Sequence, residues 1–408
     1  MLQHLIASCA DVFDRIVVVA GPDMAVVAEA AAPHATVVQQ ERLGTAHAAL
    51  QAVPLFGDGD VAVLYADNPL IRAETLRRLL AARQGAALAM LAMRPAKPGR
   101  YGRVVTENGL VQRVVEWADA TETERAVGLC NAGVFCAAGV DLERWLRAVR
   151  PSVAKGEYYL TDCVAAAVAE GGRVVAVEAG EDELRGVNSR VELAEAEATV
   201  QSWLRRDAME GGATLVAPET VMFSADTVLE PDVLVEPHVV FGPGVHVAGG
   251  AVIRAFSHLE GCRVGVGAVV GPYARLRPGT ELGVGSRVGN FVELKATRIG
   301  AGSKVNHLTY LGDSIVGRGT NIGAGTITCN YDGYAKHRTS IGAGVFVGTH
   351  STLVAPVVLG DGAFVAAGSV ITRDVPCDAM AFGRAEQVEK PGRAAAYRAS
   401  KSWAKDKT

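Results

Sequence analysis

A histidine and three basic residues in the second half of the chain could together handle a phosphorylated substrate. The histidine is His307, and the cations are Arg277, Lys295 and Lys336. Arginine presents a planar fork of donors and lysine a point charge, so three such side chains on nearby turns of one fold could converge on one phosphate. Each of them taken singly is more often a solvated surface residue, and so is an isolated histidine. The group as a whole therefore indicates a phosphate site beside an imidazole.

An acidic residue ends a predicted strand in the first half of the chain. Asp67 follows the apolar run 61–65, and ligands of open α/β sheets bind at the carboxyl ends of the strands. A carboxylate there is well placed to hold Mg²⁺, which keeps phosphate oxygens as partners, although an Asp that caps the next helix fits the same position. Upstream, Leu43-Gly44-Thr45 precedes a predicted helix, and its backbone could come close to a flat ligand.

The elements that carry the His307 group follow from a repeat of six residues. An aliphatic residue recurs at every sixth position through three stretches, often followed by a glycine. The repeated residues are Val233, Val239, Val245 and Ala251, then Val264, Val270, Leu276, Leu282, Val288 and Leu294, and finally Ile341, Val347, Leu353, Leu359, Val365 and Ile371. This period is typical of a parallel β-helix, in which each short strand points one aliphatic residue inward. A β-sandwich with accidental spacing is the alternative.

The chain divides into three regions that differ in their pattern of apolar and polar residues. Residues 1–188 alternate apolar runs (16–19 and 61–65) with amphipathic stretches (73–83 and 160–170), which predicts an α/β domain with a mostly parallel sheet. Residues 189–211 read as one long helical linker, and residues 212–408 as the β-helix domain. The polar segment 329–340 interrupts the repeat; such a loop is often functional, although a tolerated surface insertion fits as well.

The composition excludes several classes of protein. A length of 408 residues suggests at least two domains, and the net charge of −4 argues against a nucleic-acid scaffold or a polybasic membrane binder. The seven cysteines are scattered, without a C-x-x-C pair, so neither a disulfide framework nor a zinc ribbon is supported. We expect a cytoplasmic protein with no signal peptide and no membrane span.

Motifs in both halves of the chain resemble one bacterial family. In the first half they are Gln39 with Leu43-Gly44-Thr45, Tyr65-x-Asp67, Tyr101-Gly102-Arg103, Val115-Glu116, Asn131-x-Gly133, Gly156-Glu157-Tyr158 and Gly186-Val187-Asn188; in the second half they are the segments 271–279, 307–313 and 321–333. From residue 2 to about residue 390, the chain resembles the bifunctional N-acetylglucosamine-1-phosphate uridylyltransferase/glucosamine-1-phosphate N-acetyltransferase. The resemblance implies a nucleotidyltransferase-like domain followed by a left-handed parallel β-helix, assembled as a homotrimer.

For the first half, the resemblance implies attack of N-acetylglucosamine-1-phosphate on the α-phosphorus of UTP. The product, UDP-N-acetylglucosamine, serves peptidoglycan and lipopolysaccharide synthesis in that family. Gln39, Gly44 and Thr45 would contact the uracil and ribose, Tyr65 and Ala66 would line the nucleotide site, and Gly102, Glu116 and Asn131 would hold the sugar. Asp67 and Asn188 would hold Mg²⁺ at the nucleotide-sugar site.

For the second half, the resemblance implies acetyl transfer from acetyl-CoA to glucosamine-1-phosphate. His307 would be the general base, a role that suits a side chain whose pKa lies near neutrality. The sugar phosphate would be bound by Arg277, Lys295, Tyr310, Asn321 and Lys336. The acetyl-CoA groove between neighbouring copies would be lined by Ala324, Asn330, Tyr331, Thr349, Ala367 and Arg384.

The chain departs from the family pattern in three places. The family begins with a strand and a Gly-rich loop that cradles the triphosphate, whereas this sequence begins at Met1-Leu2 with the family's first helix. As written, the chain is therefore expected to have little uridylyltransferase activity; we favour a true start upstream over a genuine truncation. Ala66 stands where the family usually has Gly, and Thr349 where it usually has Ser, which keeps the hydroxyl.

Three other readings compete with this one. A different sugar-phosphate nucleotidyltransferase could carry the β-helix only for assembly or regulation. A zinc enzyme of the hexapeptide class could use three of the histidines, although no pair among them has a recognisable ligand spacing. A non-catalytic assembly scaffold is the third. The His307 group and the loop 329–340 count against a purely structural solenoid.

Overall fold

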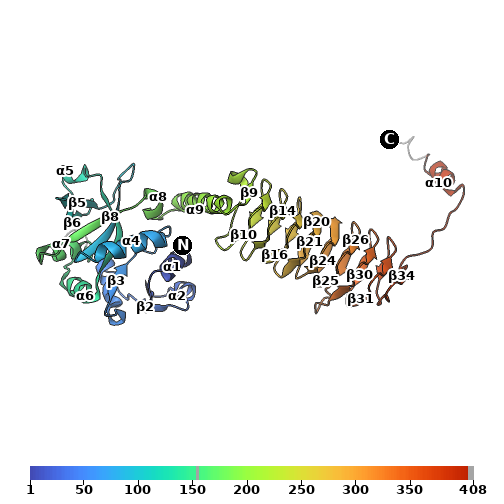
Figure 1. Ribbon diagram of the computed structural model, residues 1–408, viewed down its shortest axis with the longest axis horizontal. Coiled ribbons are helices and arrows are strands. Elements are labelled where there is room, and N and C mark those ends of the chain that lie inside the picture. The colour runs from blue at the N-terminus through green and yellow to red at the C-terminus, as the bar shows by residue number, and fades with distance from the viewer. Residues whose placement is uncertain (153–155, 403–408) are drawn as a thin grey trace. The chain divides into compact units, whose positions relative to one another are not determined.

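The computed structural model describes residues 1–152 and 156–402, and the chain forms two compact units, Met1–Val200 and Gln201–Thr408. The first is an α/β unit and the second is a stack of short parallel strands (Figure 1). The division between the units falls inside one long helix, α9 (Arg190–Glu210). Its last turns belong to the second unit, where Leu204 and Ala208 pack against the first coil of the stack.

The first unit contains a six-stranded sheet and a separate two-stranded one. The six-stranded sheet has the order β6-β5-β7-β4-β8, with β3 paired to β7. Its strands are β3 (Asp60–Val63), β4 (Leu88–Met93), β5 (Arg103–Glu107), β6 (Leu110–Val115), β7 (Cys130–Ala138) and β8 (Val174–Glu178), and the small sheet pairs β1 (Val17–Ala20) with β2 (Ala35–Val38). The α/β class is confirmed. The expected parallel pairing holds for β1–β2 and β4–β8, whereas β7 runs antiparallel to β3, β4 and β5.

Helices cover both faces of the six-stranded sheet. The helices of this unit are α1 (Leu2–Ala10), α2 (Ala25–Ala31), α3 (Thr45–Gln51), η1 (Val53–Leu55), α4 (Ala73–Arg83), α5 (Glu122–Arg125), α6 (Gly139–Ala148), α7 (Asp162–Ala169) and α8 (Glu181–Leu184). All six residues of β4 are buried. Alternate residues join two cores, Leu88 and Met90 with α3, α6 and α7, and Ala89 and Leu91 with α1, α4 and α8. A strand buried on both faces reads as an unbroken apolar run.

The second unit is a three-sided β-helix in which every strand pairs in parallel with the strand one coil away. We call its sheets faces 1, 2 and 3, in the order in which the chain visits them. Face 1 holds β10 (Val228–Leu229), β13 (His246–Val247), β16 (Cys262–Val264), β19 (Thr280–Leu282), β22 (Arg298–Ile299), β25 (Ser314–Val316), β28 (Thr339–Ile341) and β31 (Val357–Leu359).

Faces 2 and 3 complete each coil. Face 2 holds β9 (Thr214–Leu215), β11 (Leu234–Val235), β14 (Val252–Ile253), β17 (Val269–Val270), β20 (Arg287–Asn290), β23 (Lys304–His307), β26 (Asn321–Ile322), β29 (Phe346–Val347), β32 (Phe364–Val365) and β34 (Met380–Ala381). Face 3 holds β12 (Val240–Phe241), β15 (His258–Leu259), β18 (Arg275–Leu276), β21 (Glu293–Lys295), β24 (Tyr310–Gly312), β27 (Ile327–Cys329), β30 (Thr352–Val354) and β33 (Val370–Ile371). A 3-10 turn, η2 (Pro218–Thr220), precedes the coils, and α10 (Arg393–Ser402) follows them.

The aliphatic repeat predicted from the sequence forms the interior of the β-helix. Every member of the three stretches is buried, from Val233 to Ile371. The first stretch has a different phase, since Val233 and Val239 come just before their strands, while the inward strand residues there are Val235 and Phe241. Each side of these first coils therefore buries two residues, and the sequence pattern had marked only one of them.

Gln201 closes the first coil from helix α9. Its Nε2 donates to the carbonyl of Phe223 at 2.7 Å, and its Oε1 accepts from the amide of Phe223 at 2.8 Å.

Among residues 1–152 and 156–402, no helix has the length and apolar character needed to cross a membrane. Within the same residues, no group of three His, Cys, Asp or Glu side chains could hold a metal ion.

Candidate active sites

Backbone contacts hold the loop Leu43-Gly44-Thr45, which is predicted to bind uracil, in one conformation. Gly44 has a φ of +107°, and a Cβ there would lie 2.6 Å from the carbonyl oxygen of Tyr158. The amide of Tyr158 donates to the carbonyl of Leu43 at 2.8 Å. The buried Gln39 donates from Nε2 to the Gly44 carbonyl at 3.1 Å and contacts Nδ1 of His47 at 3.0 Å. Only glycine fits this close approach, so the loop shape depends on Gly44.

Replacing Gly44 with Ala should weaken binding of uridine nucleotides by at least about tenfold and destabilise the first unit by about 1–3 kcal/mol. The new Cβ would push the loop away from Tyr158. The hydrogen bond from Gln39 to the carbonyl of residue 44 would be disturbed as well. Isothermal titration with UDP-N-acetylglucosamine and thermal unfolding measure the two effects. Gly156→Ala is the matched control, because Gly156 also has a positive φ, +70°, but no atom of the described residues lies within 4 Å of its Cβ position. Equal affinity of the Gly44 variant and the parent would contradict this role.

Tyr65 and Thr45 lie together beside this loop. The phenol is hydrogen-bonded to Thr45, and burial raises the pKa of Tyr65 to about 12. Thr45 Oγ1 also accepts from the amide of Leu160 at 3.0 Å. A Cβ on Gly133, which has a φ of +74°, would lie 2.4 Å from the Tyr65 ring. Gly133 thus lets the aromatic ring pack directly on the backbone of β7.

The three residues predicted to hold the sugar are neighbours. The amide of Asn131 donates to the Gly102 carbonyl at 2.9 Å. A Cβ on Gly102 would lie 3.6 Å from both carboxylate oxygens of Glu116. Thr161 Oγ1 donates to Glu116 Oε1 at 3.3 Å. Thr161, to which no motif had assigned a role, therefore belongs to the same cluster.

Asp67 and Asn188 both approach the Cβ position of Gly186, although 120 residues of chain separate them. A Cβ on Gly186 would lie 3.9 Å from Asp67 Oδ2 and 3.6 Å from Asn188 Nδ2, and the amide of Val187 donates to the Asp67 carbonyl at 2.8 Å. Burial raises the pKa of Asp67, because desolvation disfavours the charged carboxylate. Oxygen donors of this kind suit Mg²⁺. Ala66, the other residue predicted here, is exposed.

In the second unit, four predicted residues stack in one column at the corner where face 2 meets face 3. The column runs from His307 through Ala324 and Thr349 to Ala367. Backbone hydrogen bonds link successive coils beside it: Gly325 N to His307 O at 3.3 Å, His350 N to Ala324 O at 2.7 Å and Gly368 N to Thr349 O at 2.8 Å. Arg384 reaches the same corner, with its Cδ 3.8 Å from a Cβ position on Gly368. The predicted base and four predicted acetyl-CoA residues therefore share one corner.

The His307 side chain is exposed and held by a residue that the sequence had not singled out. His307 Nδ1 lies 2.8 Å from Asn290 Oδ1, one coil away. An amide oxygen only accepts hydrogen bonds, so Nδ1 carries the proton of the neutral ring and Nε2 keeps its lone pair. This is the arrangement that a general base needs.

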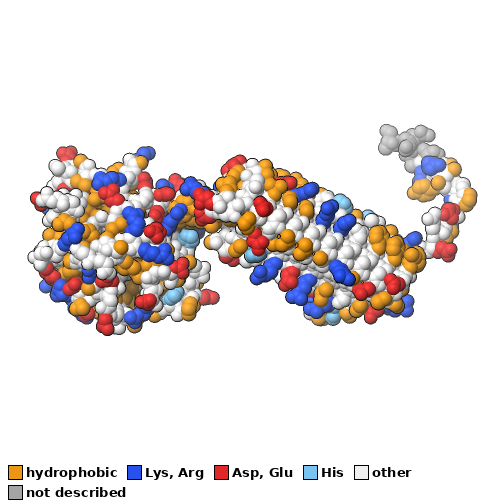
Figure 2. Space-filling model, viewed as in Figure 1, with side chains coloured by type: hydrophobic (Ala, Val, Ile, Leu, Met, Phe, Trp, Pro, Cys, Tyr) orange, Lys and Arg blue, Asp and Glu red, His pale blue; other side chains and the backbone are white. Residues whose placement is uncertain are grey.

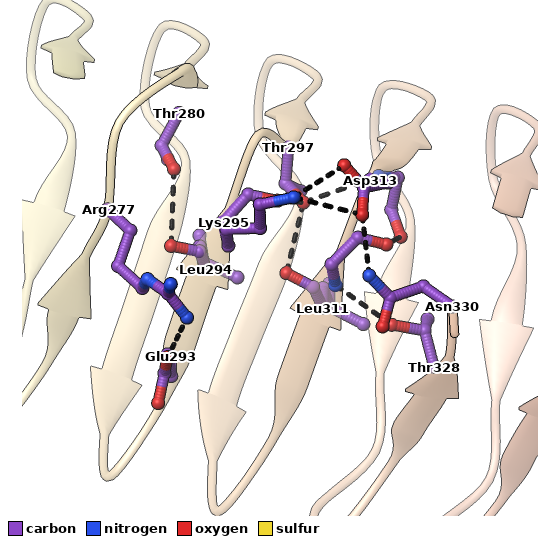
Figure 3. A network of polar contacts seen from close by, with 12 residues as sticks. Arg277, Thr280, Glu293, Leu294, Lys295, Thr297, Leu311, Asp313, Thr328 and Asn330 are labelled. Atoms are coloured by element: carbon purple, nitrogen blue, oxygen red, sulfur yellow. Dashed lines mark hydrogen bonds and ion pairs between the residues drawn. The ribbon is translucent and has the colours of Figure 1, made fainter. Parts of the chain in front are cut away.

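The three predicted cations gather at the opposite edge of face 3. Arg277 pairs with Glu293 at 2.9 Å, and Lys295 pairs with Asp313 at 2.9 Å (Figure 3). The adjacent ammonium of Lys295 lowers the pKa of Lys336, and Arg277 acts in the same direction. On the side of the molecule in Figure 2, Lys and Arg side chains also gather over the middle coils of this unit. The sequence prediction of a cationic cluster is supported by this proximity.

Two further predicted residues lie on different faces. Tyr310 is on face 3, between Glu293 and Ile327 of the neighbouring coils. Asn321 is on face 2, between Lys304 and Phe346. The structure thus places Tyr310 between the cations and His307 but does not bring Asn321 to face 3 of the same chain.

The segment that interrupts the repeat is an ordered hairpin. Tyr331 and Lys336 form an antiparallel bridge. Between them, Asp332 Oδ1 accepts from the amides of Tyr334 and Ala335 at 2.8 and 2.7 Å, and Oδ2 lies 2.7 Å from His337 Nε2. Asn330, at its base, donates from Nδ2 to Asp313. The hairpin therefore presents Lys336 beside the other two cations.

Comparisons with known proteins agree with this division. The model of the MobA-like NTP transferase domain matches residues 1–129, and that of the bacterial transferase hexapeptide (six repeats) matches residues 338–373. A relative from Gluconacetobacter diazotrophicus, named Bifunctional protein GlmU, is 68% identical over 98% of this chain and 88% of its own length. Proteins of the same name from Granulibacter bethesdensis and Acidiphilium cryptum are 64% and 61% identical, each over 98% of this chain, and over 90% and 92% of their own lengths. The family resemblance predicted from the motifs is confirmed, and the chain belongs to the family of bifunctional GlmU proteins.

Proposed function

We propose that the second unit transfers the acetyl group of acetyl-CoA to the amine of glucosamine-1-phosphate. The observation that carries this proposal is the corner column of His307, Ala324, Thr349 and Ala367, which borders the same face 3 that holds Tyr310 and, at its other edge, the three cations. An exposed imidazole above a column of small residues suits a long thioester lying along the coils. The cationic cluster suits the phosphate of the acceptor.

The reaction follows from the free lone pair on His307 Nε2. The imidazole takes a proton from the 2-amino group of the sugar, whose nitrogen then attacks the thioester carbonyl. A C–N bond forms, the C–S bond breaks, and the CoA thiolate leaves and takes up a proton. Asn290 keeps the ring in the tautomer that can accept a proton. Positioning of the two substrates supplies the remainder of the rate enhancement.

The sugar phosphate would lie across face 3. Its phosphate would meet Arg277, Lys295 and Lys336 at one edge, and its amine would meet His307 at the other, with Tyr310 between them. Asn330 and Tyr331, at the base of the hairpin, and Arg384, at the corner, would contact acetyl-CoA.

The predicted role of Asn321 requires a second copy of the chain. This residue lies on face 2, so it can reach a substrate on face 3 only if face 2 of a neighbouring copy packs there. A closed ring of three prisms satisfies this requirement for every copy. An exposed aromatic ladder along the same corner supports the assembly: His238, Phe256, Tyr273 and Phe291 stack with centroids 4.8, 4.9 and 5.3 Å apart. We therefore propose a homotrimer with shared sites.

Replacing Lys336 with Met should raise the KM for glucosamine-1-phosphate by about tenfold, because one charge-assisted contact to the phosphate is lost. The KM for acetyl-CoA should stay within about twofold. Arg338→Met, two residues further along the same loop, is the control. Steady-state kinetics with each substrate varied in turn make the comparison. If the KM for acetyl-CoA rose instead, the hairpin would belong to the acetyl-donor side of the groove.

For the first unit, we propose transfer of a uridylyl group from UTP to N-acetylglucosamine-1-phosphate, with release of pyrophosphate. The cluster of Gly102, Glu116 and Asn131 supports a sugar site, and the loop at Gly44 supports a uracil site beside it. Asp67 and Asn188 would hold Mg²⁺, which would neutralise charge on the phosphates.

The two activities are tested by following the products. Acetyl-CoA and glucosamine-1-phosphate should give N-acetylglucosamine-1-phosphate, whereas conversion of that product to UDP-N-acetylglucosamine after addition of UTP with Mg²⁺ should be slow, as the motif comparison predicts; ³¹P NMR resolves both products. A nucleotidyltransferase that uses its β-helix only for assembly would give no acetylated product. We place these reactions in the cytoplasm, in keeping with the seven cysteines, which are all free thiols.

A further inference from the structure

We infer that Asp313 is a positioning residue for acetyl transfer. It fixes the side chain of Lys295 on the phosphate side of the site and that of Asn330 on the acetyl-CoA side. This inference rests on the proposed function of the second unit. Asp313 is a non-glycine residue with a φ of +50° at the corner between face 3 and face 1. Its carboxylate lies between Lys295 and Asn330 (Figure 3), and the Lys295 and Asp313 side chains are only 21% and 23% exposed.

The carboxylate holds the ammonium of Lys295 through both oxygens. Lys295 Nζ lies 2.9 Å from Asp313 Oδ1 and 3.2 Å from Oδ2. Lysine has a flexible stem of four carbons and three N–H donors. The contact with both carboxylate oxygens holds the end of this stem in one place, beside the other two cations. Asp313 also raises the pKa of Lys295, so the cation stays charged.

The same carboxylate fixes the amide of Asn330. Asn330 Nδ2 donates to Asp313 Oδ2 at 2.5 Å. An ionised carboxylate only accepts hydrogen bonds, so the Nδ2 end of the amide must face Asp313 and the Oδ1 end must face away. The pantetheine arm of acetyl-CoA carries amide N–H donors, for which Asn330 Oδ1 is a complementary acceptor. Asp313 therefore determines that acetyl-CoA contacts the Oδ1 end of the Asn330 amide.

Charge and geometry make opposite predictions for this residue. A negative group beside three cations weakens their attraction for a phosphate. If charge dominated, removing the carboxylate would tighten the binding of glucosamine-1-phosphate. If positioning dominates, removal frees Lys295 and Asn330 and weakens the binding of both substrates. The short contacts to both partners favour positioning.

Asp313→Asn tests the inference with little effect on the backbone, because Asn is among the residues that best tolerate a positive φ. An amide is neutral and replaces one acceptor oxygen with an N–H₂ donor, so Lys295 and Asn330 lose the charge and one of the two oxygens that they now contact. We expect the KM for glucosamine-1-phosphate and that for acetyl-CoA each to rise by about tenfold, with an unchanged trimer mass and thermal midpoint. Asp232→Asn is the matched control, since Asp232 is exposed and has a φ of +64° in the same β-helix. If the Asn variant did not fold, Asp313→Gly should show the same two rises.

A double-mutant cycle separates the two arms of the network. In a Lys295→Met background, Asp313→Asn should no longer change the KM for glucosamine-1-phosphate but should still raise that for acetyl-CoA. A lower KM for the sugar phosphate in the single variant, or unchanged values for both substrates, would overturn the inference alone. Absence of acetyl transfer by the unmodified protein would overturn the proposed function and the inference together.

Discussion

Replacing His307 with Ala lowers acetyl transfer by roughly 10²–10⁴-fold, the range expected when a general base is removed. The variant should bind both substrates, because the cations and the corner column remain. Its kcat should therefore fall far more than its KM values change. The measurement is CoA thiol release at saturating acetyl-CoA and glucosamine-1-phosphate, together with the KM for each substrate.

A second histidine of the same β-helix gives the control for this result. His246 lies on face 1, paired with Glu230 at 3.5 Å and away from the corner column. His246→Ala should leave acetyl transfer within about twofold of the unmodified protein. Unchanged turnover of the His307 variant would remove this residue from the chemistry, and an equal loss in both variants would point to general damage to the β-helix.

Replacing Phe291 with Asp should break the homotrimer and abolish acetyl transfer with it. Phe291 is 56% exposed at the end of the aromatic ladder, on the coil before His307. An exposed apolar ridge of this kind marks an interaction surface. Three carboxylates brought into one closed assembly would be desolvated without partners, which is strongly unfavourable. We expect sedimentation to give the monomer mass and acetyl transfer to fall by at least about 10²-fold, since each proposed site needs Asn321 of a neighbour and the substrate positioning that the groove supplies.

Val266→Asp is the matched control for the assembly. Val266 is also exposed and apolar, 53% accessible, but it lies between β16 and β17, at the corner of faces 1 and 2. This variant should remain trimeric and active. A trimeric Phe291 variant, or dissociation of both variants, would show that the ladder is not the contact between copies. Both variants should still bind uridine nucleotides through the first unit. This binding shows that the variants are folded.

The sequence predicted the interior of the β-helix well because its coils impose a strict local rule. Each side of a coil must bury an aliphatic residue, so Ile341, Val347 and Leu353 could be read directly from their spacing. Helix α4 was predicted at its observed bounds for a similar reason, since its apolar residues share one face. Such patterns depend on neighbours in the chain and need no knowledge of the tertiary fold.

Contacts between coils were harder to predict. Ala324 and Thr349 occupy the same column although the hairpin at Asn330 separates them, and a six-residue count does not carry across such an insertion. Asn290 and Asp313 act through partners one coil away, so neither stood out in the sequence. The resemblance to a family supplied most of the candidate residues. The structure added the placement of each on a face or corner.

In the first unit, the sequence could not determine the direction of β7. An apolar strand buried on both faces looks the same in either direction, and the parallel pairing expected from alternating strands and helices applies only to part of this sheet. The cluster of Gly102, Glu116 and Asn131 came from motifs, and Thr161 joined it only when the fold brought α7 beside β6.

The central claim is that an imidazole and a phosphate clamp on one β-helix acetylate an amino sugar phosphate. Its most direct test is thiol release from acetyl-CoA by the unmodified protein, with glucosamine-1-phosphate, glucosamine or no acceptor. We predict one thiol for each N-acetylglucosamine-1-phosphate formed and a rate with unphosphorylated glucosamine at least about 10²-fold lower, because the cations then have no anion to hold. Equal rates with the two sugars, or no thiol release with either, would contradict it.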